Sequence, residues 1–324
     1  MPSLASIAAE VGVSRTTVSN AYNNPEQLSK ALRERILAVA KARGYAGPDP
    51  MARSLRTQKT GAIGVVLTEA LNFAFEDKAS VDFLAGLSDI RDYSLTLIPD
   101  GASMHTAIVD GIVVYSVPSE DPQLADAQAR GLPLVVCDQP KDVEVPFVGI
   151  DDRKAIKPAA EALVRAGHRR VGILAKRMFS EPYNGEVEDV SSADLVVQRE
   201  RVLGAQEVLG EVPVVTRHLN DPDSAADGAR ELLGLYPDLT AVLCTTDSMA
   251  LGVLEAFGET LSVTGFDGIE EARLRGLTTV LQPNRRKGEA AGVMLRSLID
   301  GRPTGPERII LDTDFVPGST VFEV

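Results

Sequence analysis

A short polar segment near the N-terminus carries side chains that could read the base edges of DNA. Arg15 can donate two hydrogen bonds to a guanine, and Thr16 or Asn20 can meet other bases. On a helix, Arg15 would share an exposed face with Ser19, and Thr16 with Asn20, because residues four apart point the same way. The candidate DNA-contacting residues of this segment are Ser14, Arg15, Thr16, Thr17, Ser19, Asn20 and Asn23.

Three helices are expected to position these side chains. The first begins after the cap Ser3 and runs to about Glu10, the second follows the cap Ser14, and the third follows the cap Ser29. Gly12 lies between the first two helices, where a tight turn would need a positive φ. The pattern is typical of a helix-turn-helix, whose second helix enters the major groove. A helical cap on a larger domain is the alternative.

Charge is distributed unevenly along the 324 residues, and the uneven distribution supports this interpretation. The chain as a whole carries −13. Residues 1–60 nevertheless hold nine basic and four acidic side chains, so this segment is +5 and the remainder is −18. A basic head favours contact with nucleic acid, because phosphates attract Lys and Arg. Charge alone leaves a solvated helical surface as the alternative.

A linker follows the predicted head. Gly47-Pro48-Asp49-Pro50 would break a helix, and residues 51–56 could then form about one and a half helical turns. A helix this short is marginal alone, and it could form when two copies pack together on DNA. A flexible basic tether is the alternative.

From Thr60 onward, apolar strand-like runs alternate with helical patterns. Such alternation predicts parallel sheets covered by helices on both faces. Two sheets of this kind would bring ligand-facing loops together at the carboxyl ends of their strands. The expected strands are 62–67, 95–98, 111–115, 134–138 and 147–150 in the first half, and 170–175, 212–217, 241–245 and 261–266 in the second.

Several classes of function have no motif in the sequence. No nucleotide-binding fingerprint, nucleophile elbow or metal-ligand spacing of histidines is present, so neither catalysis, a cofactor nor a metal is expected. Cys137 and Cys244 lie in apolar runs and are expected to be buried and reduced. No apolar run approaches the roughly 18 residues of a membrane span, and the N-terminus lacks a secretion-signal pattern. A cytoplasmic protein without membrane contact is therefore expected.

The N-terminal segment resembles the head of the lactose/galactose repressor (LacI/GalR) family. The resemblance is carried by residues 4–20, LASIAAEVGVSRTTVSN, and continues at Asn23, Ser29, 33–36 and Gly44-Tyr45. The remainder is similar to the effector-binding core of the same family. The matching pieces are VDGIVV at 109–114, GHRRV at 167–171, RVLG at 201–204, DSMALG at 247–252, GFD at 265–267 and TTVLQP at 278–283.

The resemblance implies an all-α helix-turn-helix head and an α/β core of two Rossmann-like subdomains, similar to type I periplasmic binding proteins. It implies a DNA-binding domain at 1–46, a hinge at 47–60 and an effector-binding and dimerisation core at 61–324. The first subdomain would comprise about 61–157 and 284–307, and the second about 158–281 and 308–324. A hinge helix would lie in the minor groove, where Leu55 would wedge between base pairs with Ala52 and Arg53 beside it.

The function implied is that of a transcriptional repressor, not an enzyme, that binds a partly palindromic operator as a homodimer. A small polar effector, a sugar or a nucleoside-like compound, would control operator affinity from a cleft between the subdomains. Asp247 would accept hydrogen bonds from its hydroxyls and Arg201 would donate to it. The cleft would further be lined by Tyr115, Gln282 and an aromatic ring from Phe73 or Phe75.

Two features depart from the family pattern. Asp223 stands where relatives often have an aromatic residue, which removes a stacking surface for the effector. The acidic segment 176–197 is longer than usual, and either covers the cleft or is mobile. A solute-binding receptor and, with less support, an α/β enzyme with an accessory helical head are the alternative functions.

Overall fold

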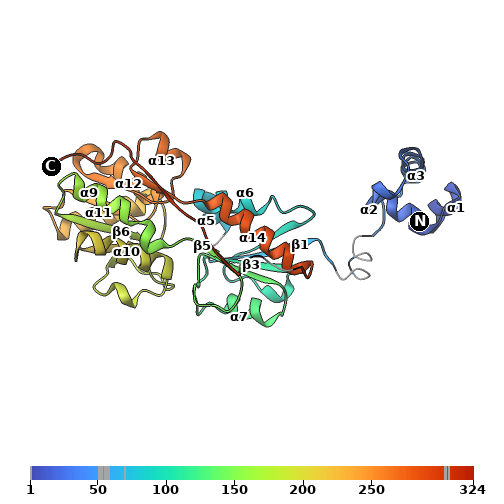
Figure 1. The fold of residues 1–324 in the computed structure, drawn as a ribbon, viewed down its shortest axis with the longest axis horizontal. Helices are drawn as coiled ribbons and strands as arrows, with labels where there is room; N and C mark the ends of the chain where they lie inside the picture. The colour runs from blue at the N-terminus through green and yellow to red at the C-terminus, as the bar shows by residue number, and fades with distance from the viewer. Residues whose placement is uncertain (1, 50–53, 55–58, 69–70, 303–304, 306) are drawn as a thin grey trace. The chain divides into compact units, whose positions relative to one another are not determined.

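The computed structural model describes residues 2–49, 54, 59–68, 71–302, 305 and 307–324. The chain divides into two compact units, a head at Met1–Thr60 and a core at Gly61–Val324 (Figure 1). In the described residues, no helix is long and apolar enough to cross a membrane.

The head is a bundle of short helices around a small apolar centre. Ile7, Val18 and Ile36 are fully buried there, one from each long helix. Gly12 adopts a φ of 75° at the turn, as predicted. The predicted helix-turn-helix is confirmed, with α1 (Leu4–Val11), α2 (Arg15–Asn23), a 3-10 turn (Pro25–Gln27) and α3 (Lys30–Ala42).

The first α/β half of the core, here the first subdomain, is built on a parallel six-stranded sheet. Its strand order is β12-β5-β4-β3-β1-β2. Helices α6 and α14 pack on one face of the sheet and α7 on the other (Figure 1). The elements are β1 (Ala62–Leu67), α5 (Leu71–Glu76), α6 (Lys78–Leu87), β2 (Ser94–Ile98), β3 (Gly111–Tyr115), α7 (Pro122–Ala129), β4 (Leu134–Cys137), β5 (Phe147–Gly149), α14 (Asn284–Ile299) and β12 (Arg308–Ile310).

The second subdomain is built on a five-stranded sheet of order β10-β9-β6-β8-β7, in which only the β7–β8 pair is antiparallel. Helices α9 and α10 pack on one face, and α11 and α12 on the other. Its elements are α8 (Asp152–Ala155), α9 (Lys157–Arg165), β6 (Val171–Lys176), β7 (Gly185–Glu186), α10 (Val196–Leu209), β8 (Val214–Arg217), α11 (Pro222–Leu235), β9 (Ala241–Cys244), α12 (Asp247–Phe257), β10 (Ser262–Thr264) and α13 (Glu270–Leu274).

The chain passes between the subdomains in three places. It leaves the first after β5, returns to it between β11 (Thr279–Leu281) and α14, and leaves again between β12 and β13 (Asp314–Val316). The predicted boundaries near residues 157 and 308 need correction, because Ala155 and Ile156 already pack in the apolar core of the second subdomain. Residues 308–310 belong to the first subdomain, because β12 pairs in parallel with β5 and completes the edge of that sheet.

The acidic segment 176–197 is part of the second subdomain. Gly185–Glu186 forms its edge strand against β8, and Val190 and Ala193 are buried in its apolar core. The last residues of the segment, Leu195 and Val197, line a cavity between the subdomains. The end of the segment therefore borders the cleft.

Candidate DNA-contact surface and effector cavity

Arg15 and Thr16 present the exposed face of α2. Both side chains are exposed, and neither has a side-chain hydrogen bond within the described head. Ser14 and Thr17 also stabilise the start of the helix, because the Ser14 Oγ accepts a hydrogen bond from the Thr17 N–H at 3.0 Å and so caps α2. Among the predicted DNA contacts, Arg15 and Thr16 are thus the side chains most free to meet a base edge.

The three remaining predicted contacts on α2 are held by neighbouring polar groups. The Asn20 amide donates to Gln27 Oε1 at 2.8 Å, and the Asn23 amide donates to Ser19 Oγ at 3.1 Å. Such bonds fix amide orientations before any DNA contact is made. The predicted hinge contacts Ala52, Arg53 and Leu55 lie outside the described residues.

A cavity of about 580 Å³, including part of its open mouth, lies between the subdomains. From the first subdomain it is lined by Leu67, Thr68, Asp77, Ser80, Tyr115 and Gln139, and from the second by Lys176, Arg177, Leu195, Val197 and Gln198. The side chains include carboxylate, hydroxyl, amide and cationic groups beside aliphatic ones, which suits a polar ligand with some apolar surface.

The cavity lies at the carboxyl ends of β1, β3 and β6. In each sheet the chain order reverses beside these strands, between β1 and β3 and between β6 and β9, which is where open α/β sheets bind ligands. Residues with positive φ follow several strands: Ser116 after β3, Asp138 after β4, Arg177 after β6 and Asp267 after β10. Strained backbone of this kind concentrates at ligand sites.

Three contacts join the cavity walls across the cleft. Lys176 Nζ lies 3.4 Å from Asp77 Oδ2. Arg177 Nη1 donates to the Thr68 carbonyl at 3.2 Å, and the Val197 N–H donates to Gln139 Oε1 at 3.0 Å. The relative position of the two subdomains is therefore tied to groups that line the cavity.

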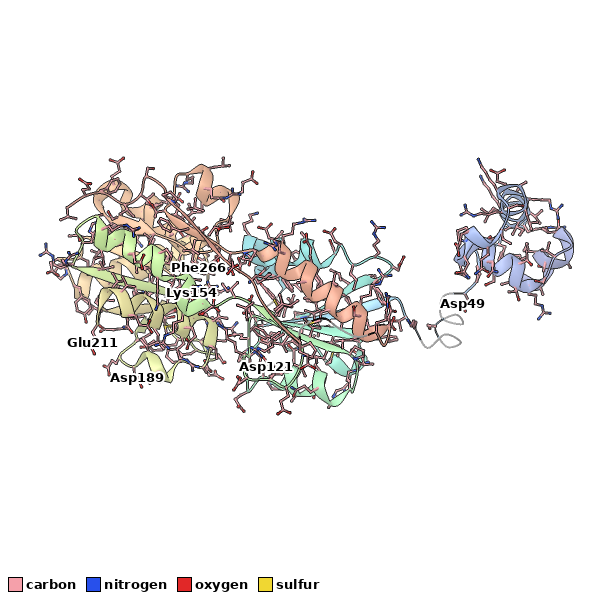
Figure 2. The ribbon with its side chains drawn as sticks, viewed as in Figure 1. Asp49, Asp121, Lys154, Asp189, Glu211 and Phe266 are labelled. Atoms are coloured by element: carbon pink, nitrogen blue, oxygen red, sulfur yellow. The ribbon has the colours of Figure 1, made fainter. Side chains whose placement is uncertain are left out.

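Arg201 lies behind the cavity, one helical turn from Gln198 on α10. Its Nε donates to Asp152 Oδ1 at 3.0 Å and its Nη1 to the Thr245 carbonyl at 2.9 Å. The guanidinium carbon lies 3.9 Å from the centre of the Phe266 ring, which Figure 2 shows within the second subdomain. Arg201 is only 5 % exposed, so these partners hold it rigidly.

Gln282 links the polar side chains around Arg201 to the first subdomain. Its Nε2 donates to Asp267 Oδ1 at 2.5 Å, and its Oε1 accepts from Lys287 Nζ at 3.0 Å. Lys287 in turn donates to both oxygens of Asp138, at 2.9 and 2.7 Å. Together with Arg201 and Asp152 these side chains form a buried polar network that spans both subdomains.

Asp247 does not line the cavity. It is fully buried, its Oδ1 accepts from Thr279 Oγ1 at 2.5 Å, and its Oδ2 accepts the Ile269 N–H at 2.9 Å. Burial raises the pKa of this carboxyl to about 6, against the opposing effect of the Thr279 hydrogen bond. Asp267 supplies the carboxyl group that contacts Gln282, although it was not among the predicted site residues. Its position after Gly265-Phe266, at a strand end, was the available signal.

The predicted aromatic residues separate into different environments. Tyr115 lines the cavity and stacks on Phe83, with ring centres 4.0 Å apart. Phe75 is 57 % exposed and does not line the cavity, although its helix neighbour Ala74 does. The Phe73 side chain lies outside what the structure describes. Asp223, which stands where relatives often have an aromatic residue, lies in the first turn of α11.

The ionisation of Asp267 should give the core a measurable pH dependence. Burial raises the pKa of Asp267 to about 8, although Arg201 lowers it. Between pH 6 and 8 the folded state therefore retains a proton that the unfolded chain has lost, so stability falls as pH rises and the dependence levels off above about pH 8. Asp267→Asn should remove this slope in urea unfolding curves recorded across that range. The exposed Asp223→Asn variant is the control, and an unchanged slope in Asp267→Asn would contradict the assignment.

Comparison with known proteins gives family matches for both the head and the core. Residues 3–47 match the model for bacterial regulatory proteins of the lacI family, and residues 160–321 match the periplasmic binding protein-like domain. The HTH-type transcriptional regulator IpsA from Corynebacterium glutamicum is 51 % identical, and the match covers 98 % of this chain and 97 % of that protein.

Solved structures show the same architecture. A LacI-family transcriptional regulator from C. glutamicum superposes with a TM-score of 0.77 at 48 % identity, covering 98 % of both chains. A complex of the transcriptional regulator CelR with cellobiose superposes with a TM-score of 0.69 at 27 % identity, covering 99 % of this chain and all of that one. The chain therefore belongs to the LacI family, and it is a helix-turn-helix transcriptional regulator with a periplasmic-binding-protein-like core rather than an enzyme.

Proposed function

We propose that this regulator is a repressor whose operator affinity is controlled by a small polar effector bound between the core subdomains. The observation that carries the proposal is the cavity at the strand ends, whose walls are joined by contacts from both subdomains. A ligand there would contact groups whose spacing depends on the relative position of the two halves. It would therefore bind the two core conformations with different affinity, which control of a distant site requires.

The buried network supplies a route for this control within the core. Arg201 and Gln282, both predicted to face the effector, belong to it, and Asp267 joins them. Gln198, which lines the cavity, and Arg201 lie on the same helix, so an effector that displaces the first turn of α10 would change the contacts of Arg201 and the balance between the subdomains. The complex of CelR with cellobiose supports a sugar-like ligand for a related core.

We also propose that the protein binds a partly palindromic operator as a homodimer. Two heads, each covering residues 1–46, would meet two half-sites, and the hinge at 47–60 would order between them. The basic head supports DNA as the partner, since a solute-binding receptor or an enzyme has no need of an exposed Arg15 on a helix-turn-helix.

Titration of DNA from the promoter next to the protein's own gene tests this function. Fluorescence anisotropy should show tight, salt-dependent binding to one site, and saturation at two chains per duplex. A panel of sugars and nucleosides should contain a compound that changes this affinity. Failure to bind any site in that promoter would refute the regulator proposed here, whichever ligand the core accepts.

Arg15→Ala should weaken specific operator binding by about 1–3 kcal/mol and relax the preference at one base pair, because the guanidinium fork is lost. Competition between operators that each differ at one position measures both effects. Arg15→Lys is the matched control for charge, since it retains the attraction to phosphates but not the fork. An unchanged base preference in Arg15→Ala would show that another face of α2 meets the bases.

A further inference from the structure

We infer that the effector carries a phosphate group, which binds between the Arg177 guanidinium and the first turn of α10. This inference rests on the proposed function, because it names the chemistry of the ligand that such control requires. It depends on an arginine, a helix terminus and an amide that line the same cavity.

Arg177 has unused donors that are shielded from water. Its Nη1 donates to the Thr68 carbonyl at 3.2 Å and its Nη2 to the Ser180 carbonyl at 3.4 Å. Its Nε is buried and has no hydrogen-bond partner. The two carbonyl bonds leave several guanidinium N–H groups, including that of Nε, for an acceptor from the cavity.

The positive charge of Arg177 has no counterion among the described residues. Asp77 contacts Lys176, and the same carboxylate accepts the Ala79 N–H at 3.0 Å. Asp194 accepts the Ser180 N–H at 2.9 Å. A partly buried cation bonded only to carbonyl groups is costly to keep, and a ligand anion would offset that cost.

The N-terminus of α10 borders the same space. Leu195 occupies the cap position, so no side chain of the helix's own segment caps it, and Leu195, Val197 and Gln198 all line the cavity. Among the described residues, the Val197 N–H is the one amide of this turn that is bonded from across the cleft, by Gln139. Free N–H groups at a helix N-terminus attract anions through their partial positive charge.

Gln198 provides the third group. It is 8 % exposed, its Oε1 is buried without a partner, and its side chain makes no hydrogen bond within the described residues. Rotation of the amide would aim its N–H groups at the position that Oε1 now occupies. Arg177, α10 and Gln198 thus present more donors than a neutral hydroxyl can use.

A phosphate fits this set of donors because it offers three strong acceptor oxygens. On the opposite wall Ser80, Asp77 and Tyr115 can exchange hydrogen bonds with hydroxyl groups. The class of ligand is therefore a phosphorylated polyol or sugar, with its phosphate on the second subdomain and its hydroxyls on the first.

Thermal unfolding of the full chain in matched ionic strength tests the inference with inorganic phosphate, glucose 6-phosphate, gluconate and glucose as probes. Phosphate and glucose 6-phosphate should raise the unfolding temperature of the wild type, and glucose should have little effect. Arg177→Met should weaken binding of both phosphate probes by about tenfold to a hundredfold. Gln198→Glu is isosteric and should abolish their effect by repulsion, which gives a second test if Arg177→Met folds poorly.

Matched controls separate the site from general charge effects. Arg230→Met removes an exposed arginine on α11, and Gln206→Glu adds the same charge two turns further along α10, so both should respond like the wild type. Equal shifts with glucose and glucose 6-phosphate, a larger shift with gluconate, an unaltered response in both site variants, or no response to any probe would each overturn the inference. Operator binding measured on the same samples distinguishes that result from failure of the proposed function.

Discussion

Replacing Lys287 with methionine should lower the free energy of unfolding of the core by about 3–5 kcal/mol. The Lys287 side chain is 1 % exposed, and its ammonium group donates to both oxygens of Asp138 and to Gln282. Burial by itself lowers the pKa of Lys287, but the charge and hydrogen bonds of Asp138, together with the nearby Cys137 and Asp152, outweigh it, and the pKa is raised overall. Methionine would leave the Asp138 carboxylate buried without its counterion, which accounts for the size of the effect.

Urea unfolding followed by circular dichroism measures this loss, and two further variants define its cause. Lys157→Met removes a half-exposed lysine that pairs with Glu207, and should cost less than about 1 kcal/mol. Combining Lys287→Met with Asp138→Asn should recover part of the stability, because the carboxylate is no longer charged. Equal costs for Lys287→Met and Lys157→Met would contradict the assigned role of the buried pair.

Gly288→Ala should destabilise the core by about 3 kcal/mol, because α14 and α6 approach too closely for a methyl group. A Cβ at Gly288 would lie 2.1 Å from the Phe83 carbonyl oxygen and 2.6 Å from the Leu87 nitrogen, both of them backbone atoms of α6. The facing glycine, Gly86, is equally restricted, since its Cβ would lie 1.9 Å from the Arg285 carbonyl oxygen. The helices would have to separate to accept either substitution.

Gly234→Ala is the matched control for this prediction. Gly234 also lies in a helix, α11, but a Cβ there would meet no atom within 4 Å. Alanine should therefore stabilise this position by about 0.5–1 kcal/mol through helix propensity. Calorimetry of both variants measures the difference, and a Gly288→Ala protein as stable as the wild type would show that α14 can move without penalty.

The head could be predicted in detail because its signals are local in sequence. Ser3, Ser14 and Ser29 each cap the helix that follows them, and Gly12 has the positive φ that its turn requires. Strands such as 62–67 and 241–244 were equally clear, since fully buried parallel strands are continuous apolar runs.

The candidate effector site was only partly predictable, because its geometry depends on which distant strand ends meet. Tyr115 was expected in the cleft and lines it, whereas Asp247 turns toward Thr279 and away from the cavity. Nothing local distinguishes Asp247 from Asp267, since both follow an apolar strand. Arg177 was missed for a related reason: its neighbours Thr68 and Ser180 come from different parts of the chain.

The hydrogen bond from the Val197 N–H to Gln139 has a consequence for secondary structure itself. Helix α10 begins in the second subdomain, but the side chain that satisfies one of its first amides belongs to the first. When the subdomains separate, that amide must find water or the first turn must unwind. The hydrogen bonding of the first turn of α10 is therefore shared between both halves of the core, so the stability of that turn depends on how close the halves lie.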